Sequence, residues 1–251
     1  VKLGYTFTTE CDTEVVLRAY EFWGIPCFNR LNGVWAIVIW AGRTNELIAV
    51  RDRLGQKPMF YAQVGDDWIF TSEIKPLFLH PAIRPAPNER ALARFLTLSA
   101  PPVGEETFYA GIKSLEGGTY LRFRDGRVTK TRYWQLDTNS YPQRTDVSAL
   151  KEELNALITD AVRLRMRGDL RVGSMLSGGV DSTSVITSIT QVLAARHRES
   201  RSIGDCLQAF TASFAGMPID ETAKVEELCR GIEIQVAKIF PGELDHIEDR
   251  L

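Results

Sequence analysis

The chain has 251 residues, 44% of them hydrophobic, which is enough for one large domain or two ordinary ones with a buried core. Its 30 Lys and Arg against 32 Asp and Glu give a formal net charge of −2, which offers no electrostatic argument for nucleic acid or an anionic membrane as partner. The longest apolar run, 34–41, has the length of a strand and is far too short to span a bilayer. Four cysteines without a CxxC pair, and three histidines, argue against a zinc site and favour reduced thiols in a cytoplasmic protein.

The first part of the chain predicts a helix followed by strands. Asp12 is a good N-cap candidate for a helix that Gly24 ends, because apolar residues recur between them at helical spacing. Strands joined by tight polar turns are expected at 34–40, 46–51, 58–63 and 68–72. Because such neighbours pair antiparallel, they predict one antiparallel sheet. The run 34–40 is apolar on both faces, which predicts a strand covered on both sides.

A second helix and a hairpin complete this part. Asn88 is expected to cap a helix that reaches about Leu98. Asp125-Gly126 is a strong turn signal between two further strands.

After residue 135 the pattern changes. Residues 136–146 are polar and poor in apolar side chains, which is typical of a linker. Asp146 then caps a long helix with a 3.6-residue apolar period. Strands at 170–176, 207–214 and 233–240 alternate with helices at 181–195 and 221–229. This alternation predicts a doubly wound parallel sheet. We therefore expect two domains, an α+β domain over 1–135 and an α/β domain over 147–251.

The segment 172–183 joins a strand to a helix through the glycine-rich elbow Ser177-Gly178-Gly179-Val180-Asp181-Ser182. Such an elbow aims backbone N–H groups and the positive end of a helix at one point, which favours a phosphate group. The two glycines let a ligand approach the bare backbone, and Asp181 and Ser182 can cap the helix or contact phosphate oxygens. The alternative is an ordinary strand–helix turn capped by Asp181, although this pattern arises by chance in roughly one such chain in ten thousand.

No Gly-Lys-Ser/Thr follows the glycines, so the elbow is not of the Walker type. It resembles the pyrophosphate loop of the ATP pyrophosphatases, which adenylate a substrate and release pyrophosphate. This resemblance implies ATP cleavage between the α and β phosphates.

The N-terminal half resembles the glutaminase domain of the class II glutamine amidotransferases, which are N-terminal-nucleophile hydrolases. The matching pieces are Gly4-Tyr5-x-Phe7-x-Thr9, Cys11-Asp12-Thr13-Glu14-Val15, Leu31-Asn32-Gly33-x-Trp35-Ala36, Arg51-Asp52-Arg53-x-Gly55-x-Lys57-Pro58-Met59-Phe60-Tyr61 and Ser72-Glu73-Ile74-Lys75. In the Arg51–Tyr61 piece we favour a structural interpretation, in which Gly55 supplies a turn and Arg51 pairs with Asp52. Together with the elbow, these motifs resemble the glutamine-hydrolysing asparagine synthetase family.

The resemblance implies site residues in both halves. Asp12 would hold the α-amino group of glutamine, with a plain helix cap as the alternative. The nucleotide and its pyrophosphate would be bound by Leu176, Ser177, Gly178, Gly179, Asp181, Ser182 and Ala212, with Ala212 meeting adenine and Asp181 also a ligand of Mg²⁺. The acidic pair Asp220-Glu221 is expected to cap a helix.

The implied reaction converts aspartate, glutamine and ATP into asparagine, glutamate, AMP and pyrophosphate. Mg²⁺–ATP would form a β-aspartyl-adenylate, and ammonia from glutamine would travel internally to attack it. The enzyme would be a cytoplasmic carbon–nitrogen ligase with glutamine, aspartate and ATP as partners, and a homodimer is one assembly that the resemblance allows.

Departures from the family pattern restrict this reading. The family's nucleophile is an N-terminal cysteine, which Val1 is not, and neither Cys11 nor Cys27 lies in a Cys-Gly context, so no catalytic residue is assigned. The later glycine-rich acidic motif of the family does not occur before Leu251. We therefore expect an internal fragment that neither hydrolyses glutamine nor makes asparagine by itself. The alternatives are a β-lactam-synthetase-like or other amidotransferase that adenylates another acceptor, and a non-catalytic nucleotide-binding relative.

Overall fold

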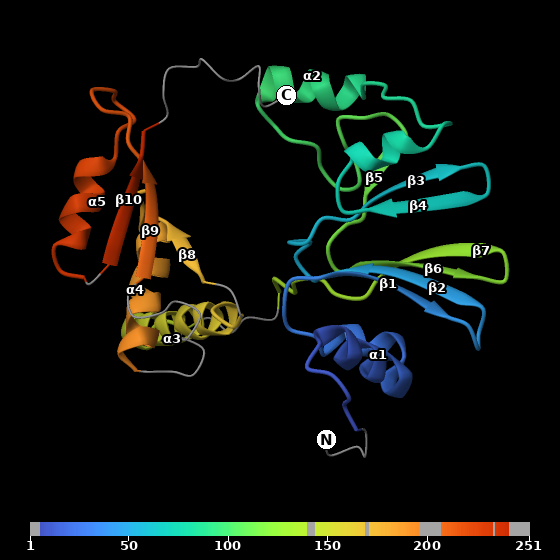
Figure 1. Ribbon diagram of the computed structural model, residues 1–251, viewed down its shortest axis with the longest axis horizontal. Coiled ribbons are helices and arrows are strands. Elements are labelled where there is room, and N and C mark those ends of the chain that lie inside the picture. Colours follow the sequence, from blue (N-terminus) through green and yellow to red (C-terminus); the bar gives the residue numbers. More distant parts are fainter. Residues whose placement is uncertain (1–5, 140–143, 169–170, 196–206, 233, 241–251) are drawn as a thin grey trace. The chain divides into compact units, whose positions relative to one another are not determined.

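The computed structural model describes residues 6–139, 144–168, 171–195, 207–232 and 234–240. The chain is a mixed α/β protein with antiparallel and parallel sheets, and it divides into two compact units, Val1–Ser140 and Tyr141–Leu251 (Figure 1). Among the helices of the described ranges, none has both the length and the hydrophobicity needed to cross a bilayer.

The first unit contains two antiparallel sheets that face each other (Figure 1). One sheet has the order β1-β2-β6-β7, from β1 (Ala36–Ala41), β2 (Glu46–Arg51), β6 (Thr119–Arg124) and β7 (Arg127–Arg132). The other has the order β4-β3-β5, from β4 (Asp67–Thr71), β3 (Phe60–Val64) and β5 (Ile112–Ser114). Buried side chains from both sheets, among them Tyr61 and Leu121, form a common core.

Helices cover the outer faces of these sheets. α1 (Asp12–Trp23) and η1 (Ile25–Asn29) pack on the first sheet, where Phe28 is fully buried against Ile48. η2 (Lys75–Leu79) packs on the second sheet through Leu77. α2 (Glu89–Leu98) begins as predicted, because Asn88 Oδ1 accepts the N–H of Ala91 at 3.3 Å.

The prediction of one sheet from the first four strands is wrong, because β2 and β3 belong to different sheets. The connection between them is organised by the buried carboxylate of Asp52, which is 2% exposed. It accepts backbone N–H groups from Trp35, Leu54, Gln56 and Lys57 at 2.9–3.3 Å. These bonds stabilise a tight loop that carries the chain from one sheet to the other.

Two further expectations for this unit are corrected. Strand β1 is not covered on both sides, because Val38 and Trp40 on one of its faces are 46% and 61% exposed. Arg51 forms no ion pair with Asp52, since its guanidinium donates instead to the carbonyls of Gly55, Lys57 and Leu115. Each charged side chain thus satisfies backbone groups of the loop, which agrees with the structural interpretation of this motif.

The second unit is built on a parallel sheet with the order β10-β9-β8. Its strands are β8 (Gly173–Met175), β9 (Leu207–Ala212) and β10 (Ile234–Ile239), and its helices are α3 (Val147–Arg165), α4 (Val180–Ala194) and α5 (Thr222–Cys229). Asp146 caps α3 as predicted, with Oδ1 accepting the N–H groups of Ser148 and Ala149.

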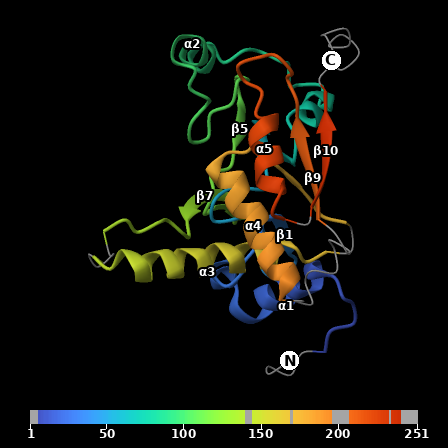
Figure 2. The ribbon, with the colours of Figure 1, turned by 90° about the vertical axis from the view of Figure 1, so that its left-hand side faces the viewer.

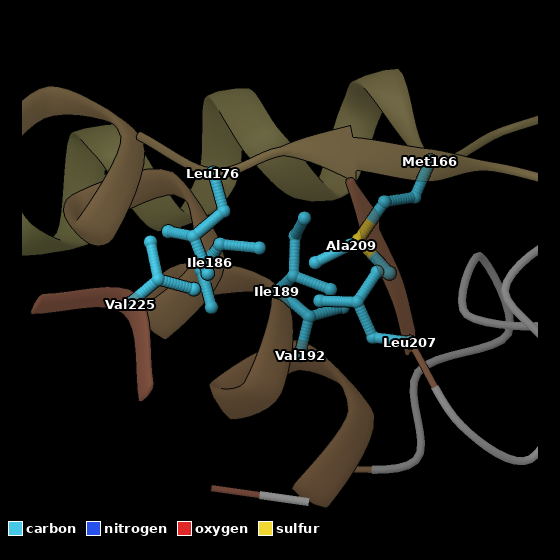
Figure 3. Packing of buried hydrophobic residues seen from close by; sticks show 8 residues of the cluster. All are labelled: Met166, Leu176, Ile186, Ile189, Val192, Leu207, Ala209 and Val225. Atoms are coloured by element: carbon cyan, nitrogen blue, oxygen red, sulfur yellow. The ribbon is translucent and has the colours of Figure 1, made fainter. Parts of the chain in front are cut away.

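The core of the second unit joins the strands to α4 and α5, which run beside β9 and β10 (Figure 2). Leu207 and Ala209 of β9 pack against Ile186 and Ile189 of α4, and Val225 of α5 closes the cluster (Figure 3). The parallel strand order agrees with the predicted sheet. A doubly wound arrangement, with helices on both faces, stays a prediction.

Candidate functional site

The predicted phosphate loop connects β8 to α4. Leu176 is 2% exposed, and its N–H donates to the carbonyl of Phe210 at 2.8 Å, which ties the start of the loop to β9. Gly178 has a φ of +71°, in the left-handed region that favours glycine, so the turn requires this residue. The loop therefore has a bare backbone at the carboxyl edge of a parallel sheet, where ligands of such sheets bind.

Helix α4 starts one residue earlier than expected. Gly179 is the N-cap, without a side-chain capping bond, and its carbonyl accepts the N–H of Thr183 at 3.0 Å. Asp181 lies inside the first turn, so the alternative in which it caps this helix is wrong. The first N–H groups of the helix have no intrahelical partners and point toward the loop.

The two loop serines hold the elbow closed. The Oγ atoms of Ser177 and Ser182 are 3.0 Å apart, Ser182 Oγ donates to the carbonyl of Gly179 at 3.2 Å, and the N–H of Ser177 donates to Ser182 Oγ at 3.3 Å. These bonds preorganise the loop backbone without a ligand.

Ala212 lies near the same edge. It is the last residue of β9, and the parallel register places Met175 beside Phe210, so Ala212 is level with the start of the loop. The structure thus brings together Leu176, the Ser177–Ser182 loop and Ala212. Their contacts with ATP stay predictions.

The candidate Mg²⁺ ligand Asp181 stands alone as a carboxylate within the loop. Among the described residues, no group of three or more His, Cys, Asp or Glu side chains could hold a metal. Mg²⁺ usually takes one or two carboxylates together with substrate phosphates and water, so a single exposed carboxylate beside a phosphate loop fits this ion.

In the first unit, Asp12 is the first residue of α1, not its cap. The N-cap is Cys11, which makes no side-chain capping bond, so the helix-cap alternative for Asp12 is wrong in this form. Glu14 instead binds the preceding segment, with its carboxylate accepting the N–H and Oγ–H groups of Thr8 and Thr9 at 2.7–3.2 Å. These bonds lower the pKa of Glu14 to about 2. Glu14 thus anchors the helix start, and the carboxylate of Asp12 is exposed. Its contact with glutamine stays a prediction.

Cys11 and Cys27, which the sequence analysis rejected as catalytic nucleophiles, lie in different environments. Cys27 is fully buried, and burial raises the pKa of its thiol to about 11. Cys11 is exposed, and hydrogen bonding with Thr13 lowers the pKa of its thiol. Only the thiolate is strongly nucleophilic, so the environment of Cys27 makes it unreactive.

Sequence reasoning missed the contacts that place α5. Thr222 Oγ1 lies 2.9 Å from Ser213 Oγ and 2.5 Å from Asp220 Oδ1, and the N–H of Thr222 donates to the same carboxylate oxygen at 3.1 Å. These hydrogen bonds lower the pKa of Asp220. Asp220 thus accepts the N–H of the first residue of α5, as its expected capping role requires, whereas Glu221 occupies the N-cap position and makes no side-chain capping bond. The Ser213 contact had no signal in the linear sequence.

Comparisons with known proteins agree on one family. A family model described as a glutamine amidotransferase domain matches residues 1–134, and one described as asparagine synthase matches residues 153–247. Asparagine synthetase [glutamine-hydrolyzing] 3 of Bacillus subtilis (strain 168) is 34% identical over 186 residues, 74% of this chain and 30% of the relative. Asparagine synthetase [glutamine-hydrolyzing] 1 of the same organism is 29% identical, over 96% of this chain and 36% of the relative.

A relative with another name also matches. Amidase chyE of Penicillium rubens is 28% identical over 247 residues, which cover 94% of this chain and 36% of that protein. The chain spans about a third of the length of the curated relatives it matches.

Proposed function

This chain belongs to the asparagine synthetase family, and we propose that the protein of which it is part makes asparagine from aspartate, with glutamine as nitrogen donor and ATP cleaved to AMP and pyrophosphate. The observation that carries the proposal is the Ser177–Ser182 loop. It combines a positive-φ glycine, a helix N-terminus and a position at the carboxyl edge of a parallel sheet.

In this proposal the loop binds the phosphates of ATP. The N–H groups at the start of α4 and the hydroxyls of Ser177 and Ser182 donate to phosphate oxygens and stabilise the charge that develops on departing pyrophosphate. Leu176 and the end of β9 at Ala212 contact the nucleoside. Asp181 is the residue that would hold Mg²⁺, which when bound offsets charge on the phosphate oxygens.

The first unit contributes the glutamine site. The exposed carboxylate of Asp12, at the first turn of α1, pairs with the α-amino group of glutamine. Ammonia released there would attack an aspartyl-adenylate formed at the second site. We accordingly interpret 1–135 as glutaminase domain, 136–146 as linker and 147–251 as synthetase domain.

The experiment is isotope exchange between ATP and pyrophosphate by the full-length protein, with and without aspartate. We expect exchange that requires aspartate and that falls at least tenfold in Asp181→Asn, because the variant loses the Mg²⁺ ligand. Asp160→Asn, which changes an exposed carboxylate of α3 that pairs with Arg163 of its own helix, is the control and should leave exchange unchanged. If the rate of ATP–pyrophosphate exchange were the same with and without aspartate, the proposal of asparagine synthesis would be contradicted.

A second candidate is an enzyme that adenylates another carboxylate. The observation behind this candidate is that a protein with a name other than asparagine synthetase, an amidase, is 28% identical over 94% of this chain. The same exchange assay separates the two functions, because exchange dependent on a different carboxylic acid, and not on aspartate, would support the second.

A further inference from the structure

Lys224, a cationic residue of α5, lies next to the Ser177–Ser182 loop. Residues 172–183 contain no Lys or Arg, and Asp181 adds a negative charge to the loop. A Cβ atom built on Gly178 would lie 3.0 Å from Lys224 Cβ and 3.7 Å from Lys224 Cδ. The aliphatic part of Lys224, on the first turn of α5, therefore runs alongside Gly178.

The start of α5 is held in this position by the end of β9. Ser213, 6% exposed, donates its N–H to the carbonyl of Ile239 and lies 2.9 Å by its Oγ from Thr222 Oγ1. Val225, the neighbour of Lys224, is 1% exposed, and its Cγ2 also lies 3.6 Å from the atom built on Gly178. A buried anchor and a hydrogen bond thus place the stem of Lys224 beside the loop.

The present partner of Lys224 is a weak one. Its Nζ lies 3.4 Å from Glu221 Oε1, three residues earlier on the same helix, and the two side chains are 68% and 41% exposed. Exposed pairs of this kind contribute little to stability, so the ammonium can leave Glu221 at small cost. A pyrophosphate group carries more charge than one carboxylate and competes well for a lysine.

Resting on the proposed function, we propose that Lys224 binds the pyrophosphate portion of ATP at the Ser177–Ser182 loop, exchanging Glu221 for a phosphate oxygen. Lys224 would then supply the positive charge that the loop itself lacks. The alternative is that Lys224 only covers Gly178 with its alkyl chain. The two roles separate because one needs the charge and the other needs only the stem.

The test is isothermal titration calorimetry of the full-length protein with magnesium pyrophosphate and, separately, with adenosine. Lys224→Met keeps most of the stem and removes the charge, whereas Lys224→Arg keeps both. Lys151→Met is the matched control, an exposed lysine of the same unit, on α3. α3 contacts α4 near the far end of that helix from the loop, where Thr159 Oγ1 lies 3.1 Å from Gln191 Oε1.

We expect Lys224→Met to bind pyrophosphate about tenfold more weakly, the order expected for one charged hydrogen bond, with unchanged adenosine affinity and thermal midpoint. Lys224→Arg should stay within about threefold of wild type, because it restores the charge, and Lys151→Met should equal wild type. Wild-type affinity in Lys224→Met, or an equal loss for adenosine, would overturn the role of Lys224 and leave the proposed function standing. Failure of the wild type to bind pyrophosphate would overturn both.

Discussion

The replacement Gly178→Ala tests the loop geometry most directly. At a φ of +71° an L-residue is disfavoured by about 1–2 kcal/mol relative to glycine. The added methyl group would also lie 3.0 Å from Lys224 Cβ, closer than the usual 3.5–4.0 Å carbon contact, so α5 would have to shift. We expect a loss of about 2 kcal/mol in the free energy of unfolding of the second unit.

Gly216→Ala is the matched control for this replacement. Gly216 has a φ of +82°, but a Cβ built on it meets no atom within 4 Å. It therefore carries the backbone penalty without the contact, about 1 kcal/mol. Urea denaturation of the full-length protein, followed by hydrogen exchange in α4 and α5, compares the two variants.

Ligand binding gives a second measurement on the same variants. The methyl group of Gly178→Ala points at Lys224 and Val225 of α5, so it displaces the loop backbone whose N–H groups would bind the phosphates. We therefore expect the affinity for magnesium ATP to fall at least tenfold. Wild-type affinity in Gly178→Ala would refute the argument that the loop backbone holds the phosphates. Equal destabilisation of Gly178→Ala and Gly216→Ala would refute the contact with α5.

Three further predictions concern the first unit. Because the pKa of Glu14 lies near 2, its contribution to stability should be present above about pH 4.5 and be lost as the pH falls toward 2, which thermal unfolding of wild type and Glu14→Gln measures. Asp52→Ala should lower the free energy of unfolding in urea by about 4 kcal/mol, because four backbone N–H groups lose their acceptor. At pH 8, iodoacetamide should label the exposed Cys11 well before the buried Cys27, as peptide mass spectrometry would show.

Each of these predictions has its own contradicting result. Identical acid profiles for wild type and Glu14→Gln would mean that the contacts with Thr8 and Thr9 do not persist in solution. Asp66→Ala, in an exposed hairpin turn, is the control for Asp52→Ala and should change stability by less than about 1 kcal/mol. A similar loss of unfolding free energy in Asp52→Ala and Asp66→Ala would contradict the claim that the Asp52 carboxylate stabilises the loop between β2 and β3. Equal labelling of the two cysteines would mean that the core around Cys27, in which Phe28 packs against Ile48, opens readily.

Local signals in the sequence determined much of the molecule. The caps Asn88 and Asp146, the Asp125-Gly126 hairpin and the strand–helix alternation after residue 146 appear in the structure as predicted. Each depends on neighbours within a few residues, because a cap or a tight turn is satisfied by its own segment. The Ser177–Ser182 loop belongs to the same class, since its glycines and serines act within one elbow.

Long-range choices were decided only by the tertiary structure. The sequence indicated four strands, but not that β2 and β3 would enter different sheets, because that depends on the Asp52 carboxylate and on burial between the sheets. The sequence motifs predicted a role for Gly178 but not for Lys224, which follows 46 positions later along the chain. Lys224 lies beside Gly178 because the contacts of Ser213 and Val225 hold the start of α5 there. Periodicity and turn chemistry act along the chain, whereas packing selects which distant surfaces meet, and here that selection placed a cation against the loop.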